Sequence, residues 1–221
     1  VTKNEDGSVD ATWPLQPGVL WHDGQPFTSR DVCFTWKFVT SPGSETYNRE
    51  QYLGIKDCSA PDDTTVVFHW DGEYAFYAGL FEAILPEHVL GQLTTEQIVN
   101  YEPYNRGSQT VGTGPFKFAE WRAGEYIRVV KNEHYWRGPN TPQIDEIVWA
   151  FIPDANTRLN PLKSNQYHYG QVQPVQVKEV EDLAGYRVHL TSSNSVMHLD
   201  LAVGTDHGRM LFEDVRVRQA V

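Results

Sequence analysis

The stretch from Val111 to Tyr169 constrains the fold more than any other part of the 221-residue chain. It opens on Gly112-Thr113-Gly114-Pro115, where the glycines permit a positive φ and the proline prevents a continuing helix. The alternating residues that follow predict a strand over 116–121 and a returning strand over 126–131. The turn at 122–125 makes this pair a predicted hairpin.

The second half of the same stretch predicts a further strand, a helix and a final strand. A β-branched and aromatic run over 144–152 is typical of a strand. Asp154 or Asn156 is a suitable cap for a short helix that ends near Asn165, and a strand then runs toward Tyr169. The order of these elements predicts a compact α+β unit, and nothing in it matches a catalytic motif.

The upstream residues predict a second group of strands and helices. The expected elements, in chain order, are a short strand within residues 1–20 that ends at 14–18, a helix over 30–39 capped by Thr28 or Ser29, a strand over 64–70, a helix over 73–85, and a short helix from Thr94 or Thr95 toward Tyr101. The aromatic residues of the 73–85 segment could face a ligand or the core, and we expect them in the core.

Composition excludes several classes of function. The formal net charge of −11 argues against nucleic acid or an anionic membrane face as a partner. No apolar run approaches the roughly 20 residues needed to span a bilayer. A hydrophobic content of 40% is that of a globular chain with a real core.

Catalytic and metal-binding patterns are also missing from the sequence. The eight histidines include no pair at helical spacing, and there is no Cys-x-x-Cys or His-Glu-x-x-His pattern. His22 beside Asp23 is better explained as part of a turn, because no nucleophile follows at a useful spacing. We therefore expect no catalytic residue, no protein-bound metal and no cofactor.

Several blocks, taken in order, resemble one protein family. They are PGVLWHDGQPFTSRDVCFTWKFV at 17–39, GTGPF at 112–116, the Tyr135-Trp136 pair before a glycine, a P-x-x-D-E-I strand, IPDANTRL at 152–159, and FEDVRVRQAV at 212–221. This order resembles the oligopeptide/dipeptide/nickel class of solute-binding proteins, family 5, which serve ABC importers outside the cytoplasmic membrane.

The resemblance implies a fold, a location and a division into domains. The fold would be mixed α/β, of the class II periplasmic-binding-protein type that binds dipeptides. Residues 1–18 would form the edge of the N-terminal lobe, residues 19–110 an inserted supporting domain, and residues 111–221 the part of the lobe that lines the ligand cleft. The chain would then be a fragment that lacks the C-terminal lobe. In an exported protein Cys33 and Cys58 could form a disulfide, or they could be two small buried hydrophobic residues.

Two stretches are candidates for ligand contact. The first follows the predicted final strand, where loops leave a sheet and polar groups can converge. It resembles the family's L-x-x-G-E-x-D-x-G segment, with Asn165 in place of glycine and His168 in place of aspartate. The second resembles a family strand whose asparagine often meets the ligand backbone; alternatively its polar residues simply face solvent. The candidate residues are Tyr169, Gly170, Gln171 and Gln173 in the first stretch, and Asp200 and Ala202 in the second.

The resemblance implies a monomeric substrate-binding component that captures oligopeptides and delivers them to the transmembrane subunits of an ABC permease. It would act in the periplasm or anchored on the outer face of the cytoplasmic membrane. An oligosaccharide ligand is the alternative, because seven tryptophans and eleven tyrosines offer stacking faces and Ala202 removes a peptide-type contact. Two different classes remain open as well, a secreted hydrolase and a ligand-sensing domain of a regulator.

Overall fold

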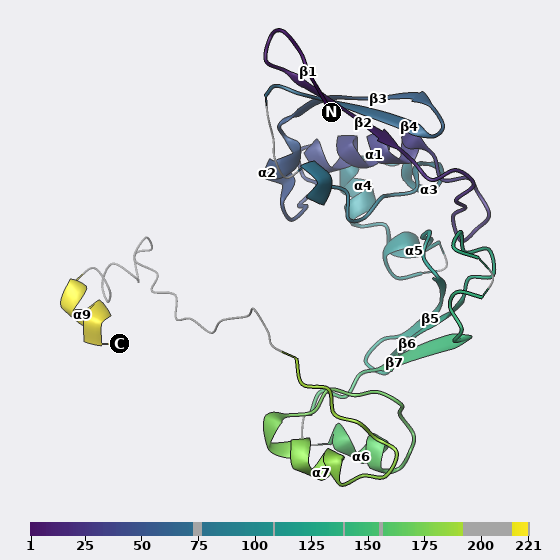
Figure 1. Ribbon diagram of the computed structural model, residues 1–221, viewed down its shortest axis with the longest axis vertical. Helices are drawn as coiled ribbons and strands as arrows, with labels where there is room; N and C mark the ends of the chain where they lie inside the picture. Colours follow the sequence, from purple (N-terminus) through teal and green to yellow (C-terminus); the bar gives the residue numbers. More distant parts are fainter. Residues whose placement is uncertain (73–76, 108, 139, 155–156, 192–213, 221) are drawn as a thin grey trace. The chain divides into compact units, whose positions relative to one another are not determined.

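The computed structural model of the chain describes residues 1–72, 77–107, 109–138, 140–154, 157–191 and 214–220. The chain forms two compact units, unit 1 over Val1–Pro153 and unit 2 over Asp154–Val221 (Figure 1). Unit 1 holds two β-sheets, while the described part of unit 2 consists of short helices joined by irregular segments. Across the described ranges, no helix combines the length and the apolar character that crossing a bilayer would require. The assignment of residues to the lobes of a larger fold stays a prediction.

A four-stranded antiparallel sheet with strand order β1-β2-β4-β3 organises unit 1. The predicted alternation is confirmed in β4, where Val66, Phe68 and Trp70 are at most 3% exposed. Strand β2 pairs with β4 along its whole length, so the N-terminal segment belongs to the same sheet. The strands are β1 (Thr2–Lys3), β2 (Val9–Pro14), β3 (Ile55–Asp62) and β4 (Thr65–Trp70).

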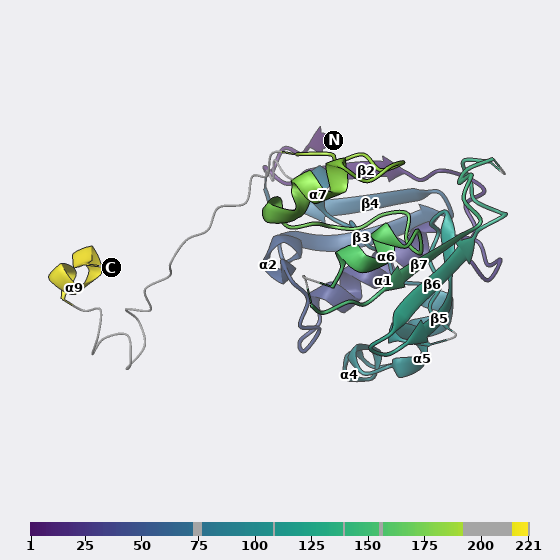
Figure 2. The ribbon, with the colours of Figure 1, turned by 90° about the horizontal axis from the view of Figure 1, so that it is seen from below.

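Helix α1 (Ser29–Thr40) packs against β3 and β4 (Figure 2). It begins after Thr28, as predicted, and the Asp31 carboxylate accepts a hydrogen bond from the Thr28 N–H at 2.8 Å. This return bond satisfies a backbone donor that has no partner within the helix. Val32 and Val39 are buried, so the predicted core face of the helix is confirmed.

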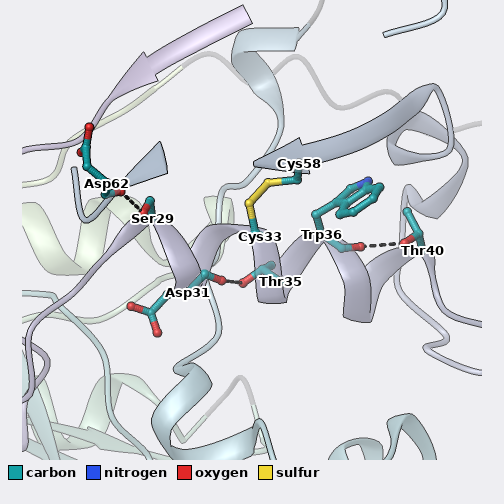
Figure 3. The surroundings of a disulfide bond; sticks show 8 residues. All are labelled: Ser29, Asp31, Cys33, Thr35, Trp36, Thr40, Cys58 and Asp62. Atoms are coloured by element: carbon teal, nitrogen blue, oxygen red, sulfur yellow. Dashed lines mark hydrogen bonds between the residues drawn. A yellow bond between two sulfur atoms is a disulfide. The ribbon is translucent and has the colours of Figure 1, made fainter. Parts of the chain in front are cut away.

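A disulfide between Cys33 of α1 and Cys58 of β3 fastens the helix to the sheet (Figure 3). The two Cα atoms lie 5.5 Å apart, and Cys33 belongs to the main core cluster. The sequence left open whether Cys33 and Cys58 form a disulfide or are two small buried hydrophobic residues, and the structure contains the disulfide. The Ser29 hydroxyl donates to the carbonyl of Asp62 at 2.5 Å, which ties the first turn of α1 to the end of β3.

The helix predicted over 73–85 is wrong for the described residues 77–85. These contain a single turn of 3-10 helix, η1 (Tyr77–Gly79). Phe81 adopts a positive φ of 61°, and its backbone N–H donates to the Tyr52 hydroxyl at 2.8 Å. A side chain from another element therefore replaces the helical partner of this N–H. The expectation that the aromatic residues belong in the core holds for Phe81, which packs against the main core cluster.

Among its described residues, unit 1 also contains four short helices. The helix predicted from Thr94 is confirmed: the Thr94 hydroxyl accepts from Gln97 N–H, and the Gln97 side chain accepts from Thr94 N–H. This reciprocal arrangement is a capping box. The helices are α2 (Arg49–Tyr52), α3 (Glu87–Leu90), α4 (Thr95–Val99) and α5 (Glu102–Asn105).

The second sheet of unit 1 confirms the predicted hairpin and third strand. It is antiparallel, with order β5-β6-β7. Register places Phe118, Val129 and Ile147 side by side on one face, which is apolar. The opposite face carries the charged residues Glu120, Arg128 and Glu146. The strands are β5 (Phe116–Arg122), β6 (Tyr126–Lys131) and β7 (Glu146–Ala150).

Unit 2 departs from the predicted order at two points. The helix expected from Asp154 or Asn156 begins only at Leu159, and no strand forms before Tyr169. The described residues of unit 2 contain no other strand that could complete a ladder, and an unpaired strand would leave its backbone groups unsatisfied. The elements are α6 (Leu159–Lys163), η2 (Pro174–Gln176), α7 (Val177–Glu181) and α9 (Val215–Ala220).

Candidate ligand-binding site

The end of helix α6 directs the chain into the candidate site. Asn165 has a φ of 54°, so it adopts the left-handed conformation that the sequence predicted it would tolerate. Gln166 N–H donates to the carbonyl of Pro161 at 2.8 Å, and Asn165 N–H donates to the carbonyl of Leu162 at 3.1 Å. This pair of bonds is the Schellman motif, which stops a helix and reverses the chain.

A small apolar core holds the segment that follows. Leu159, Leu162 and Val180 are at most 5% exposed and come from α6 and α7. The Tyr186 hydroxyl donates to the carbonyl of Tyr167 at 3.0 Å and fixes the start of the segment.

Gly170 lies so close to this core that an added side chain would press on Leu162. A Cβ atom at this position would stand 3.0 Å from Leu162 Cδ1, closer than ordinary van der Waals contact. The glycine thus lets the backbone of the candidate segment lie directly against the helix. The absence of a side chain at Gly170 thus sets how near the segment comes to the apolar core of unit 2.

A hollow of about 720 Å³ lies on the described surface of unit 2. Its volume falls within the roughly 300–1,000 Å³ typical of small-ligand sites. Aliphatic side chains form one part of its wall, and polar or aromatic groups form the rest. The aliphatic part includes Leu162, Val172, Val177 and Val180, and the remainder includes His168, Tyr169, Gln171, Tyr186, Arg187 and His189.

A smaller hollow of about 260 Å³ adjoins the first. Gln171, Val172 and Pro174 line both, and Arg158 and Gln173 line only the smaller one. The two hollows therefore share residues 171, 172 and 174 as part of their walls. Such a surface offers apolar contact and several hydrogen-bonding groups to a chain-like ligand.

The structure brings together four of the six predicted site residues. Tyr169, Gly170 and Gln171 line the larger hollow, and Gln171 and Gln173 line the smaller one. The Tyr169 side chain is 84% exposed, so its ring is available for contact. Asp200 and Ala202 lie outside the described residues. Their assignment to the site, like that of the other four, stays a prediction.

Sequence reasoning missed Arg187 and His189, which also line the larger hollow. The signal in this segment is an alternation of covered and exposed side chains, which becomes visible once the burial of each residue is known. Tyr186 and Val188 pack against the small core, while Arg187 and His189 are exposed between and beyond them. A period of two in burial is the mark of an extended segment with one covered face.

The described residues show no centre for metal binding. No group of three or more histidine, cysteine, aspartate or glutamate side chains among them could hold an ion. The described wall of the two hollows contains histidine, arginine, tyrosine and glutamine but no carboxylate. The groups present can form hydrogen bonds and offer apolar surface to a ligand.

Comparisons with known proteins point to one family. A sequence model described as "Bacterial extracellular solute-binding proteins, family 5 Middle" matches residues 2–221. The oligopeptide-binding protein AppA of Bacillus subtilis (strain 168) is 30% identical over 222 residues, which cover 99% of this chain and 39% of AppA. The chain thus spans about two fifths of the length of this curated relative.

Solved structures give the same result. The structure of AppA from Bacillus subtilis in complex with a nonapeptide superposes with a TM-score of 0.73 at 28% identity, covering 82% of this chain and 35% of that one. The structure of AgaA from A. tumefaciens R10 in complex with agropinic acid gives a TM-score of 0.67 at 27% identity, covering 83% and 36%. The mixed α/β architecture is therefore shared with these binding proteins.

Proposed function

The chain belongs to family 5 of the bacterial extracellular solute-binding proteins, and we propose that it is part of the substrate-binding component of an ABC importer that captures oligopeptides. The support is twofold. A relative that matches 99% of the chain is named an oligopeptide-binding protein, and one similar structure holds a nonapeptide. The chain itself has a hollow of suitable size, with a smaller one that shares part of its wall.

The larger hollow is the observation that carries the proposal. Apolar side chains from α6 and α7 provide a surface for ligand side chains, while Gln171 and the neighbouring backbone provide hydrogen-bonding groups. A peptide presents these two kinds of surface alternately along its length. We propose that Tyr169, Gly170, Gln171 and Gln173 contact it, together with Asp200 and Ala202.

The oligosaccharide alternative loses its main support. It rested on the abundance of aromatic residues, yet all seven tryptophans lie within residues 13–149 and none lines either hollow. Two tyrosines, Tyr169 and Tyr186, are the aromatic residues of the described wall. A sugar-binding surface of this size would be expected to offer broader stacking faces. Peptide capture is therefore the favoured function.

The remaining features of the proposal follow from the family. The protein would bind without making or breaking a covalent bond, need no cofactor, and act outside the cytoplasmic membrane as a monomer. It would hand its ligand to the transmembrane subunits of a permease. Affinity would arise from contacts that exist only when two lobes close around the ligand. A hydrolase would need convergent catalytic groups, for which the described hollow offers no carboxylate.

A thermal-shift screen of the complete polypeptide that carries this chain tests the proposal. The ligands are a randomised five-residue peptide pool, xylo-oligosaccharides, and agropinic acid. Saturation at a hundred times the dissociation constant adds about 2.7 kcal/mol to the free energy of unfolding, which is readily measured. We expect a shift with peptides. A shift with another ligand class and none with peptides would overturn peptide capture.

A further inference from the structure

The wall of the larger hollow differs in charge from the rest of the chain. The net charge is −11, and nearly all of this negative charge lies in residues 1–153. From Asp154 to Thr191, acidic and basic side chains are equal in number. Yet the ionisable and titratable groups of the hollow are His168, Arg187, His189 and two tyrosines, with no carboxylate among the described lining residues. The acidic side chains of this part of the unit lie elsewhere.

Arg187 is held in a position that suits recognition. Its neighbours Tyr186 and Val188 pack against the small core of unit 2, and the Tyr186 hydroxyl bonds to the carbonyl of Tyr167. The backbone at Arg187 is therefore anchored on both sides, while its side chain is exposed at the wall. Within the described residues no carboxylate pairs with the Arg187 side chain, whereas Lys163 on α6 is paired with Glu179 on α7.

We propose that Arg187, which lines the hollow together with His168 and His189, binds a carboxylate of the ligand while the aliphatic part of the wall takes an apolar side chain. The inference rests on the proposed function and adds the charge class of the ligand. A guanidinium binds a carboxylate through two parallel hydrogen bonds, and each charge-assisted bond is stronger than a neutral one. In an acidic protein such a group is a local point of attraction for anions.

A peptide has two sources of carboxylate, its C-terminus and its acidic side chains, and three randomised five-residue pools separate them. The first pool has free C-termini and no aspartate or glutamate. The second has amidated C-termini and none of these residues. The third has amidated C-termini but includes aspartate and glutamate. Each pool is titrated into the complete polypeptide and the bound fraction is identified by mass spectrometry.

The variant Arg187→Gln removes the charge and keeps a polar side chain of similar reach. Arg30→Gln is the matched control, because Arg30 is an exposed arginine on α1 in the other unit. We expect Arg187→Gln to weaken binding of the first or the third pool by at least about tenfold, since losing even one of the two charge-assisted hydrogen bonds has that effect. Binding of the second pool should change less than twofold, and Arg30→Gln should change none.

The outcomes separate this inference from the proposed function. If the natural protein binds the second pool as well as the others, and Arg187→Gln alters none, the carboxylate role is overturned while peptide capture stands. An equal loss for all three pools would assign Arg187 a structural role and overturn the inference in the same way. If the natural protein binds no pool, peptide capture fails and the inference fails with it.

Discussion

His22 and Gly112 are joined by two hydrogen bonds that run in opposite directions. The backbone N–H of His22 donates to the carbonyl of Gly112 at 2.9 Å, and the N–H of Gly112 donates to His22 Nδ1 at 3.0 Å. The other ring nitrogen, Nε2, lies 3.0 Å from the carbonyl of Gly114. Because Nδ1 accepts, the proton of the neutral ring must be on Nε2, which donates to Gly114. The predicted turn at His22 thus fastens the glycine-rich turn that precedes β5.

The charge state of His22 follows from this geometry. Burial is the largest influence on its pKa and lowers it below the ordinary value of 6.5, since the charged ring would lose contact with water. The hydrogen bond to Gly114 acts in the opposite direction and is outweighed. Protonation would also place a second donor at Nδ1, facing the N–H of Gly112. The folded chain therefore favours the neutral ring.

The first prediction concerns acid stability. The pKa of His22 is lower in the folded than in the unfolded chain, so its neutral ring stabilises the folded chain. This contribution is fully present above the unfolded pKa of about 6.5 and is lost as the pH falls through the lower, folded pKa. The free energy of unfolding should thus fall between pH 7.5 and 5. In His22→Gln this fall should be smaller, and the variant should be less stable at pH 7.5 by about 1 kcal/mol. Urea denaturation at pH 7.5 and at pH 5 measures the free energy of unfolding of both proteins.

His134→Gln is the matched control for this experiment, because His134 is an exposed histidine in the same unit. Comparing each variant with the natural protein at the same pH cancels the titration of all other groups. An identical pH dependence in His22→Gln and in the natural protein would show that the His22 ring does not sense protonation in the folded chain.

The second prediction concerns His69, whose pKa moves the other way. Its Nδ1 lies 2.7 Å from Asp10 Oδ1 across the β2–β4 pair, and this hydrogen bond raises the pKa of His69 above 6.5. The associated stability is present below pH 6.5 and lost as the pH rises through the raised value. We expect Asp10→Asn to lower the pKa of His69, measured by NMR titration of the ring protons. An unchanged titration would contradict the pairing.

The third prediction concerns the disulfide. Cys33 and Cys58 are separated by 25 positions, and closing a loop of this size in the unfolded chain contributes about 3 kcal/mol of stability. A reducing agent should lower the urea midpoint of the natural protein by a corresponding amount. The double variant Cys33→Ala with Cys58→Ala should be less stable from the start and insensitive to the reductant. Equal stability with and without reductant in the natural protein would indicate two free thiols.

The fourth prediction concerns the turn that leads into the candidate site. Asn165 has a positive φ, a conformation that costs an ordinary residue about 1–2 kcal/mol. Asn165→Ala should therefore destabilise unit 2 by about 1 kcal/mol, while Asn165→Gly should be tolerated. Hydrogen exchange of the α6 amides measures the effect. Equal protection in the alanine and glycine variants would show that the turn does not require this conformation.

Local sequence was enough to predict much of unit 1. The cap at Thr28, the alternation in β4 and the hairpin of β5 and β6 depend on residues close together in the chain, and all are confirmed. The helix prediction failed for the described residues 77–85 because their hydrogen-bonding partners are distant in sequence. Leu85 N–H donates to the hydroxyl of Thr35 and Glu87 N–H to the Asp31 carboxylate, both on α1. Such hydrogen bonds to distant side chains compete with helix formation, but the local hydrophobic pattern does not indicate them.

Some features of the candidate site could likewise be predicted from local sequence, and others could not. The helix stop at Asn165 could be predicted because it depends on the conformational preference of one residue. The larger hollow could not, since it requires α6, α7 and the segment around Arg187 to meet. The strand expected before Tyr169 was wrong because strand formation depends on a partner, which no single segment reveals.

The confinement of all seven tryptophans to residues 13–149 has a practical consequence for spectroscopy. Intrinsic emission excited near 295 nm, where tyrosine hardly absorbs, would come entirely from unit 1. Unit 2 carries three tyrosines and no indole ring. A ligand seated in the hollow would thus leave this emission unchanged unless its arrival were felt in unit 1. For this chain, an emission change on ligand addition would be a reporter of communication between the units, and its absence would say nothing against occupancy.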